Sequence, residues 1–156
     1  MDFFWEEALA QARKSLAEGG IPIGAVLVCD GRIVGRGHNR RLQMGSPILH
    51  AEMDAVQNAG RQPASVYRRC TLYTTLSPCV MCSGMLRLYR IAEVVVGEDV
   101  NFRGPTEELI AAGIKVRVIN DERCILMLRE FIRQHPGLWY EDIGEENRRQ
   151  HASSEY

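Results

Sequence analysis

The hydrophobic positions of this chain follow two periods, one typical of helices and one of strands. Apolar residues recur three to four positions apart over residues 3 to about 18, which predicts an amphipathic helix that ends at Gly19 and Gly20. Two short strand-like runs follow, residues 24–29 and 32–37, and the Asp30-Gly31 dipeptide between them tolerates the positive φ of a two-residue turn. The pattern predicts an opening helix followed by a β-hairpin.

Beyond the hairpin and a polar loop, helix-like and strand-like segments alternate. The predicted elements are helices over residues 50–59, 79–88, 106–112 and 122–134, and strands over 71–75, 93–97 and 114–119. A helical crossover separates the last two strands, so we expect them to be parallel. The order predicts one α/β domain over residues 1–156, in three α/β/α layers around a mixed five-stranded sheet. The polar tail, residues 145–156, is compatible with either disorder or helix.

Composition narrows the class of protein. With 156 residues, 46% of them hydrophobic, the chain can bury one sizeable core, and no segment approaches the roughly 20 apolar residues of a membrane helix. The acidic N-terminus lacks the basic flank of a secretory signal, which predicts a cytoplasmic protein. The net charge of −1 favours a small uncharged substrate, so neither nucleic acid nor membrane is an expected partner.

The chain has five cysteines, an odd number that argues against a disulfide framework. Cys79 and Cys82 form a Cys-x-x-Cys pair. Cys29, Cys70 and Cys124 lie in or beside apolar runs and are interpreted as small core residues.

Candidate chemistry is concentrated at the starts of two predicted helices. His50 and Glu52 begin the first, and Cys79 and Cys82 follow Pro78 at the start of the second. One imidazole and two thiolates supply three zinc ligands and leave the fourth position open to water, which is typical of catalytic rather than structural zinc. Zinc lowers the pKa of bound water from 15.7 to about 7, and Glu52 is placed to carry protons as the general acid and base.

Each part of this signature also has a simpler interpretation. Cys-x-x-Cys alone is equally compatible with a redox dithiol or half of a structural zinc site, His50 alone with a capping or buried histidine, and Glu52 alone with a solvated carboxylate in a first helical turn. The conjunction favours catalysis, because His-x-Glu followed by Pro-Cys-x-x-Cys is the signature of zinc deaminases. A non-enzymatic zinc domain would need a fourth protein ligand, and none is apparent near the signature.

The chain resembles the cytidine deaminase-like zinc enzymes and, within them, the fungal-type cytosine deaminases. The resemblance extends over nearly the whole chain. Its most discriminating part lies near the C-terminus, where a tryptophan is followed by an acidic pair and then by Ile-Gly-Glu. The segments that carry it are Gly19-Gly20-Ile21-Pro22-Ile23-Gly24, Gly35-Arg36-Gly37-His38-Asn39, Leu72-Tyr73-Thr74-Thr75-Leu76-Ser77-Pro78-Cys79, Val95-Val96-Gly97-Glu98-Asp99-Val100-Asn101-Phe102 and Trp139-Tyr140-Glu141-Asp142-Ile143-Gly144-Glu145.

This resemblance implies a cytidine deaminase-like fold, one Zn²⁺ per chain, a homodimer, and a C-terminal arm over about residues 136–156 that covers the active site. It also implies substrate contacts: the amide of Asn39, the N–H of Ala51, the carbonyl of Ser77, the carboxylate of Asp142, and an aromatic wall of Phe102 and Trp139 beside Ile143. Without the resemblance, Asn39 would be interpreted as a turn residue, Asp142 as a surface carboxylate, and the aromatic residues as packing.

The implied reaction is hydrolytic deamination of free cytosine to uracil and ammonia. The fungal pattern has glycine at the position of Ala51 and an acidic residue at that of Val80, so another ring such as isocytosine or guanine is an alternative substrate. A tRNA adenosine deaminase is a further alternative, although that group usually carries glutamate at the position of Ser77 and a more basic surface. The sequence leaves open which ring nitrogen of His50 binds the metal.

Overall fold

The computed structural model describes residues 2–145, so nearly all of the predicted polar tail lies outside the described residues. Its centre is a five-stranded sheet in the order β2-β1-β3-β4-β5. The strands are β1 (Gly24–Cys29), β2 (Arg32–His38), β3 (Cys70–Thr74), β4 (Glu93–Val96) and β5 (Lys115–Val118). The mixed five-stranded sheet predicted from the sequence is confirmed.

Strand pairing follows the lengths of the connections. The hairpin of β1 and β2 is antiparallel, and its turn residues Asp30 and Gly31 have φ values of 52° and 76°. Strand β1 also pairs antiparallel with β3, whereas β3 with β4 and β4 with β5 are parallel pairs. The predicted parallel crossover between the last two strands is therefore confirmed.

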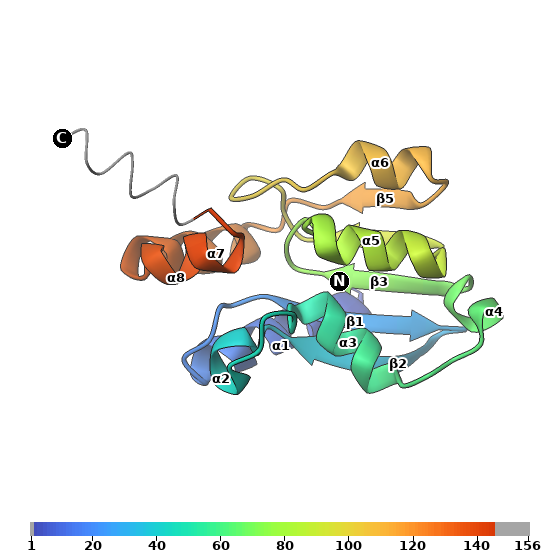
Figure 1. The fold of residues 1–156 in the computed structure, drawn as a ribbon, viewed down its shortest axis with the longest axis horizontal. Helices are drawn as coiled ribbons and strands as arrows, with labels where there is room; N and C mark the ends of the chain where they lie inside the picture. The colour runs from blue at the N-terminus through green and yellow to red at the C-terminus, as the bar shows by residue number, and fades with distance from the viewer. Residues whose placement is uncertain (1, 146–156) are drawn as a thin grey trace.

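Helices cover both faces of the sheet (Figure 1). On one face, α1 (Phe3–Ala17) packs through Trp5 and Leu9 against Val26 and Val95. The other face carries α3 (Ala51–Ala59), α5 (Val80–Tyr89) and α6 (Thr106–Ala111). A hydrophobic cluster lies on each face of the sheet, and α7 (Glu122–Gln134) contributes buried residues to both of them. The side chains of each strand alternate between these two layers, as the predicted three-layer architecture requires.

Two glycines in β2 bring α3 unusually close to the sheet. A Cβ atom added at Gly37 would collide with the backbone of Ala51 and Ala55, and one at Gly35 with the backbone of Ala55 and Ala59. Only a residue without a side chain fits between strand and helix here. This close packing fixes the position of the N-terminus of α3, which is where the signature histidine lies.

Three short helices were not predicted: α2 (Arg41–Met44), α4 (Ala64–Tyr67) and α8 (Pro136–Asp142). Helices α2 and α4 have four residues each, which is too short for a helical period to be recognised, and α8 has seven. Helix α7 ends at Gln134, and Pro136 is the first residue of α8, a position that suits proline. Among residues 2–145, no helix has the length and apolar character to cross a bilayer.

Candidate active site

Three residues from two helix N-termini form a compact donor group. His50 is the N-cap of α3 and Cys79 the N-cap of α5, with Cys82 in the first turn of α5. Cys79 Sγ lies 3.4 Å and Cys82 Sγ 3.7 Å from His50 Nδ1, and the three ligand atoms lie within 4.8 Å of one another. Tetrahedral zinc with ordinary bond lengths separates its nitrogen and sulfur ligands by about 3.6 Å. The donor group therefore fits a single zinc ion.

The structure also assigns the two nitrogens of His50. Nδ1 faces both cysteine sulfurs, whereas Nε2 lies 3.1 Å from the main-chain oxygen of Asp142 and 3.3 Å from its Oδ2. Both neighbours of Nε2 are acceptors, so Nε2 carries the proton and donates. Nδ1 is the metal-facing nitrogen, and a carboxylate behind the ligand histidine is a usual supporting arrangement at zinc.

The titration of the three donors is tightly linked. Burial opposes the charged form of His50, but hydrogen bonds with Asp142 and Cys79 outweigh it and raise the histidine's pKa to about 11. Hydrogen bonds from Cys82 and His50 lower the pKa of Cys79 to about 4, while the neighbouring Cys79 and burial raise the pKa of Cys82. Thiolate is the form that binds metal, so the site already favours it at Cys79.

Glu52 lies in the first turn of α3 and is 4% exposed. Burial raises the pKa of its carboxyl group to about 7, against the opposing effect of His50. Glu52 and the ligands His50 and Cys79 line the same small cavity. The carboxyl group is thus next to the donor group and distinct from its three ligand atoms.

The C-terminal helix α8 contributes to the walls of this cavity. Its walls come from the residue before β1, from the segment after β3, from the N-termini of α3 and α5, from the segment after β4, and from α8 and the residue after it. The lining residues are Ile23, His50, Glu52, Leu76, Ser77, Cys79, Phe102, Trp139, Asp142 and Ile143. The rings of Phe102 and Trp139 meet edge to face, with centroids 6.3 Å apart and an interplanar angle of 80°. The pocket therefore has aromatic and aliphatic walls and also carries two carboxyl groups, those of Glu52 and Asp142.

The structure brings most of the predicted substrate contacts to this cavity. Asn39 and Ala51 lie behind its wall: Asn39 Nδ2 donates to both carboxylate oxygens of Asp142, at 3.3 and 3.2 Å, and Ala51 is fully buried beside His50. Ala51 is the first residue of α3, where helix geometry leaves the N–H without an intrahelical acceptor.

A buried cluster links the C-terminal segment to the rest of the site. The Asp142 side chain is 2% exposed and also accepts from Arg41 Nη1 at 3.1 Å. Arg41 reaches Glu141 with two further bonds of 2.7 and 2.8 Å. The guanidinium of Arg41 therefore clamps α2 to α8 directly behind the cavity.

Sequence reasoning missed three residues of this arrangement: Arg41, Ile23 and Leu76. Arg41 stands in a polar stretch close to Arg36 and Arg40, and nothing in a single sequence links it to residues about 100 positions away. Ile23 and Leu76 were noted only within the matching segments. Their positions directly before β1 and two residues after β3 were the available signal, because residues at strand ends commonly line sites in α/β folds.

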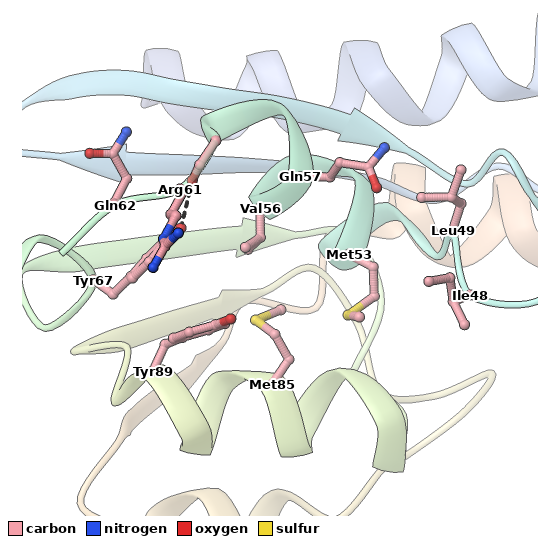
Figure 2. Close-up of a pocket in the computed structure, with 11 residues that line it drawn as sticks. Ile48, Leu49, Met53, Val56, Gln57, Arg61, Gln62, Tyr67, Met85 and Tyr89 are labelled. Atoms are coloured by element: carbon pink, nitrogen blue, oxygen red, sulfur yellow. Dashed lines mark hydrogen bonds between the residues drawn. The ribbon is translucent and has the colours of Figure 1, made fainter. Parts of the chain in front are cut away.

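A second hollow lies outside this cavity, between α3 and α5 (Figure 2). It has a volume of about 470 Å³. Met53 and Val56 project into it from α3, and Met85 and Tyr89 from α5, as Figure 2 shows. We call it the α3/α5 groove.

The fold and donor group together define a zinc-dependent deaminase: an α/β/α sandwich in which a His-Cys-Cys group and a buried glutamate share one cavity. Residues 1–98 match the family model described as the cytidine and deoxycytidylate deaminase zinc-binding region. The chain belongs to this family.

Individual relatives extend the comparison. The chain is 52% identical to the cytosine deaminase of Candida albicans over 139 residues, which cover 88% of this chain and 93% of the relative. It is 42% identical to a tRNA-specific adenosine deaminase of Streptococcus pyogenes, covering 78% of this chain and 73% of the relative. A solved structure from studies of tRNA:A34 deaminases superposes with a TM-score of 0.64 at 28% identity, covering 80% of this chain and 98% of the other. These likenesses confirm the predicted cytidine deaminase-like fold.

Proposed function

We propose that this protein deaminates free cytosine to uracil and ammonia. The observation that carries the proposal is the small cavity beside the donor group, which Trp139, Asp142 and Ile143 help to line. With α8 in this position, a nucleotide within a chain is excluded more strongly than a small planar base, which needs only a limited movement of the wall. The likeness to a cytosine deaminase spans 139 residues and so extends well beyond the zinc-binding region of residues 1–98, which supports the same substrate.

The proposed chemistry divides between the metal and the chain. Zinc would be held by His50, Cys79 and Cys82 and would supply a water whose pKa falls to about 7. That water would provide the hydroxide for the ring carbon that bears the amine, while Glu52 would carry one proton to the ring nitrogen and another to the amine. The C–N bond then breaks, ammonia leaves and the carbonyl forms. Glu52 suits this task because it is buried beside the ligands without being one.

The remaining predicted residues orient the base in this proposal. The N–H of Ala51 donates and the carbonyl of Ser77 accepts from the leaving amine, while Asn39 and Asp142 bond to polar atoms of the ring edge. Phe102 and Trp139 hold the ring faces. Support comes from the position of Ala51 at a helix N-terminus and from the bonds that fix Asn39 to Asp142.

We also propose that the C-terminal segment, residues 136–156, is an arm that opens to admit the base, within a single deaminase domain over residues 1–156. The cavity holds about 20 Å³, which is room for about one water molecule. A six-membered ring therefore needs the wall to move. Substrate entry and product release would both depend on this movement.

Two alternative reactions have specific support. Ala51 adds a methyl group where the fungal pattern has glycine, which favours testing isocytosine and guanine as substrates. The Streptococcus relative, a tRNA-specific adenosine deaminase, favours testing adenosine in RNA. Against RNA stand the covering α8 and Ser77 in place of the usual glutamate.

The test is ammonia release by zinc-loaded protein offered cytosine, isocytosine, guanine, cytidine and a short adenosine-containing RNA hairpin in parallel. We expect turnover of cytosine and none of cytidine, because a sugar would meet the arm. Turnover of another base alone would refute cytosine as the substrate while keeping the reaction class. Turnover of the hairpin alone would refute the free-base proposal, and inactivity on all five with zinc bound would favour a structural zinc domain.

We further propose a homodimer that forms through the α3/α5 groove. The family resemblance implies a dimer, and α5, which lines the groove through Met85 and Tyr89, also carries an exposed apolar stripe formed by Val80, Gly84 and Leu88 at four-residue spacing. Val80 and Leu88 are 75% and 72% exposed, and a Cβ at Gly84 would meet nothing within 4 Å. An uncharged stripe of this kind can pair with its own copy across a two-fold axis.

Light scattering on the zinc-loaded protein tests this dimer. We expect twice the mass of one chain for the wild type, and one chain's mass for Leu88→Glu, because a charge would be buried at the interface. Leu126→Glu is the matched control, since Leu126 is exposed on α7 instead. A monomeric wild type would refute the dimer, and a dimeric Leu88→Glu protein would refute this interface.

We propose a cytoplasmic enzyme of pyrimidine salvage as the setting. The support is indirect: all five cysteines are free, which suits a reducing compartment, and uracil is the product expected from free cytosine. Cell fractionation with an antibody against this protein is the test, and recovery from a secreted or organelle fraction would refute it.

A further inference from the structure

Two free cysteines outside the active site lie opposite each other on adjacent strands of the sheet. Cys29 is the last residue of β1, Cys70 is the first residue of β3, and they are partners in the antiparallel register. The alternation of hydrogen bonds along this ladder decides how close they are. Thr75 N donates to Gly24 O, so residues 24 and 75 form a hydrogen-bonded pair.

Hydrogen-bonded and non-hydrogen-bonded pairs alternate along an antiparallel ladder. Starting from the hydrogen-bonded pair 24/75, the pairs 25/74, 27/72 and 29/70 are therefore not hydrogen-bonded, and the last of these is the cysteine pair. Consistent with this, the main-chain oxygen of Cys70 accepts instead from Ala92, beside β4. Opposite residues of a non-hydrogen-bonded pair have Cα atoms about 4.5 Å apart and side chains on the same face. Disulfides join Cα atoms about 4.4–6.8 Å apart. The backbone therefore already holds the two residues within disulfide range.

The side chains point to the same place. Cys70 Sγ lies 3.2 Å and Cys29 Sγ 3.8 Å from the main-chain oxygen of Val66, so both thiols approach a single carbonyl. Immediately outside them, Arg69 and Asp30 form an ion pair at 3.2 Å, which joins the neighbouring positions of the same two strand ends. The two sulfur atoms thus lie next to α4, at the ends of β1 and β3.

The two thiols differ in access. Cys29 is 7% exposed, whereas Cys70 is fully buried, and burial raises the pKa of Cys70 to about 12. Neither belongs to the donor group of the active site. Cys124 is also buried, but it packs in the hydrophobic cluster on the opposite face of the sheet.

We propose that Cys29 and Cys70 are a modification site that forms a reversible intramolecular disulfide with a small disulfide such as oxidised glutathione. The thiolate of Cys29 attacks one sulfur of the oxidant, and one glutathione leaves as thiolate. Cys70 then loses its proton and attacks the Cys29 sulfur of the mixed disulfide, and the second glutathione leaves. Two protein thiols are oxidised and one glutathione disulfide is reduced to two thiols, so atoms and electrons balance.

The bond would close a loop that contains the first half of the active-site signature. The segment 29–70 includes Asn39, His50 and Glu52, whereas the proposed bond lies at the end of β3 remote from Cys79. Closing a loop of about 40 residues restricts the unfolded chain, and for a protein of this size the expected rise in Tm is about 10 °C. The donor group should retain its zinc, because neither cysteine contacts it.

The experiment uses full-length, zinc-loaded protein incubated with oxidised glutathione, then alkylated and digested without reduction. We expect a protein lighter by two hydrogen atoms, a cross-linked peptide pair that contains Cys29 and Cys70, unchanged zinc content, and a higher Tm that dithiothreitol reverses. The Cys124→Ser variant, a matched buried cysteine, should behave like the wild type. The Cys29→Ser variant should form no cross-link and show no rise in Tm.

Three results would overturn the proposal. One is stable glutathione on Cys29 without a cross-link, which would mean that Cys70 cannot reach the mixed disulfide. Another is a cross-link between Cys79 and Cys82 with loss of zinc, and the third is complete alkylation of both Cys29 and Cys70 after denaturation. Peptide mapping of the wild type decides among these results even if Cys29→Ser fails to fold.

Discussion

Replacing Arg41 by methionine should release the C-terminal segment from the site while leaving the zinc ligands in place. Arg41 is the link between α2 and α8, and its side chain is 13% exposed. Its bond to Asp142 reaches a carboxylate that is 2% exposed, and such a bond to a buried charge contributes about 1.5–3 kcal/mol. The two bonds to Glu141, whose side chain is 48% exposed, contribute only about 0.2–1 kcal/mol.

The sum, about 3 kcal/mol, corresponds to a roughly 100-fold change in an equilibrium constant. If closure of α8 is needed to hold the base, kcat/KM of the Arg41→Met enzyme should fall about 30- to 100-fold. The assay is steady-state ammonia release, with zinc content measured on the same samples and amide hydrogen exchange followed in residues 136–145. We expect faster exchange there and unchanged zinc.

The matched control separates the two parts of the clamp. Glu141→Gln removes only the exposed partner, so its kcat/KM should fall less than about fivefold. A kcat/KM for Arg41→Met within threefold of the wild type, with unchanged exchange in α8, would refute the inference that this guanidinium holds the segment closed.

Further expected outcomes follow from the site and from the fold. Glu52→Gln should retain zinc and fold while losing at least about 100-fold in kcat, because only the proton carrier is removed; near-normal turnover would contradict its role. Truncation before Leu138 should leave zinc bound and strongly reduce turnover, and normal kinetics would make the arm merely structural. Hydrogen bonds from Arg123, outweighing burial, lower the pKa of Asp121 to about 2. A carboxyl group whose pKa is lower in the folded than in the unfolded state stabilises the fold at pH values above its unfolded-state pKa. This stabilisation is lost as the pH falls from about 4 to about 2. Urea denaturation of the wild type should therefore show the free energy of unfolding falling by about 2 kcal/mol over this range, and Asp121→Asn should lack this fall.

The long, periodic elements could be predicted from the sequence because each buries one regular face. Helices α1 and α7 begin and end within a residue or two of the predicted bounds, and the Asp30-Gly31 turn has the positive φ values expected. The zinc donors could be predicted because their spacing places all three at helix N-termini. Local pattern was sufficient wherever the interacting residues are close together in sequence.

Contacts between distant segments could not be predicted in this way. The Arg41 clamp joins positions about 100 residues apart, and its partners are ordinary acidic residues whose burial depends on the docking of α8. The approach of Cys29 to Cys70 likewise depends on the register between β1 and β3, which no short window of sequence encodes. The sequence interpretation of both cysteines as core residues agrees with their burial, but their pairing required the sheet.

The site thus combines two parts with different origins in the chain. The zinc donors and Glu52 lie within residues 1–98, the region that matches the family model, and they provide chemistry that any deaminase of this family needs. Phe102, Trp139, Asp142 and Ile143 lie beyond it and form the outer wall of the cavity. If the wall residues contact the substrate as proposed, changes after residue 98 should alter which ring is accepted without disturbing the metal. The likeness to the Candida cytosine deaminase extends past residue 98. The C-terminal variants therefore test the choice of base rather than the reaction class.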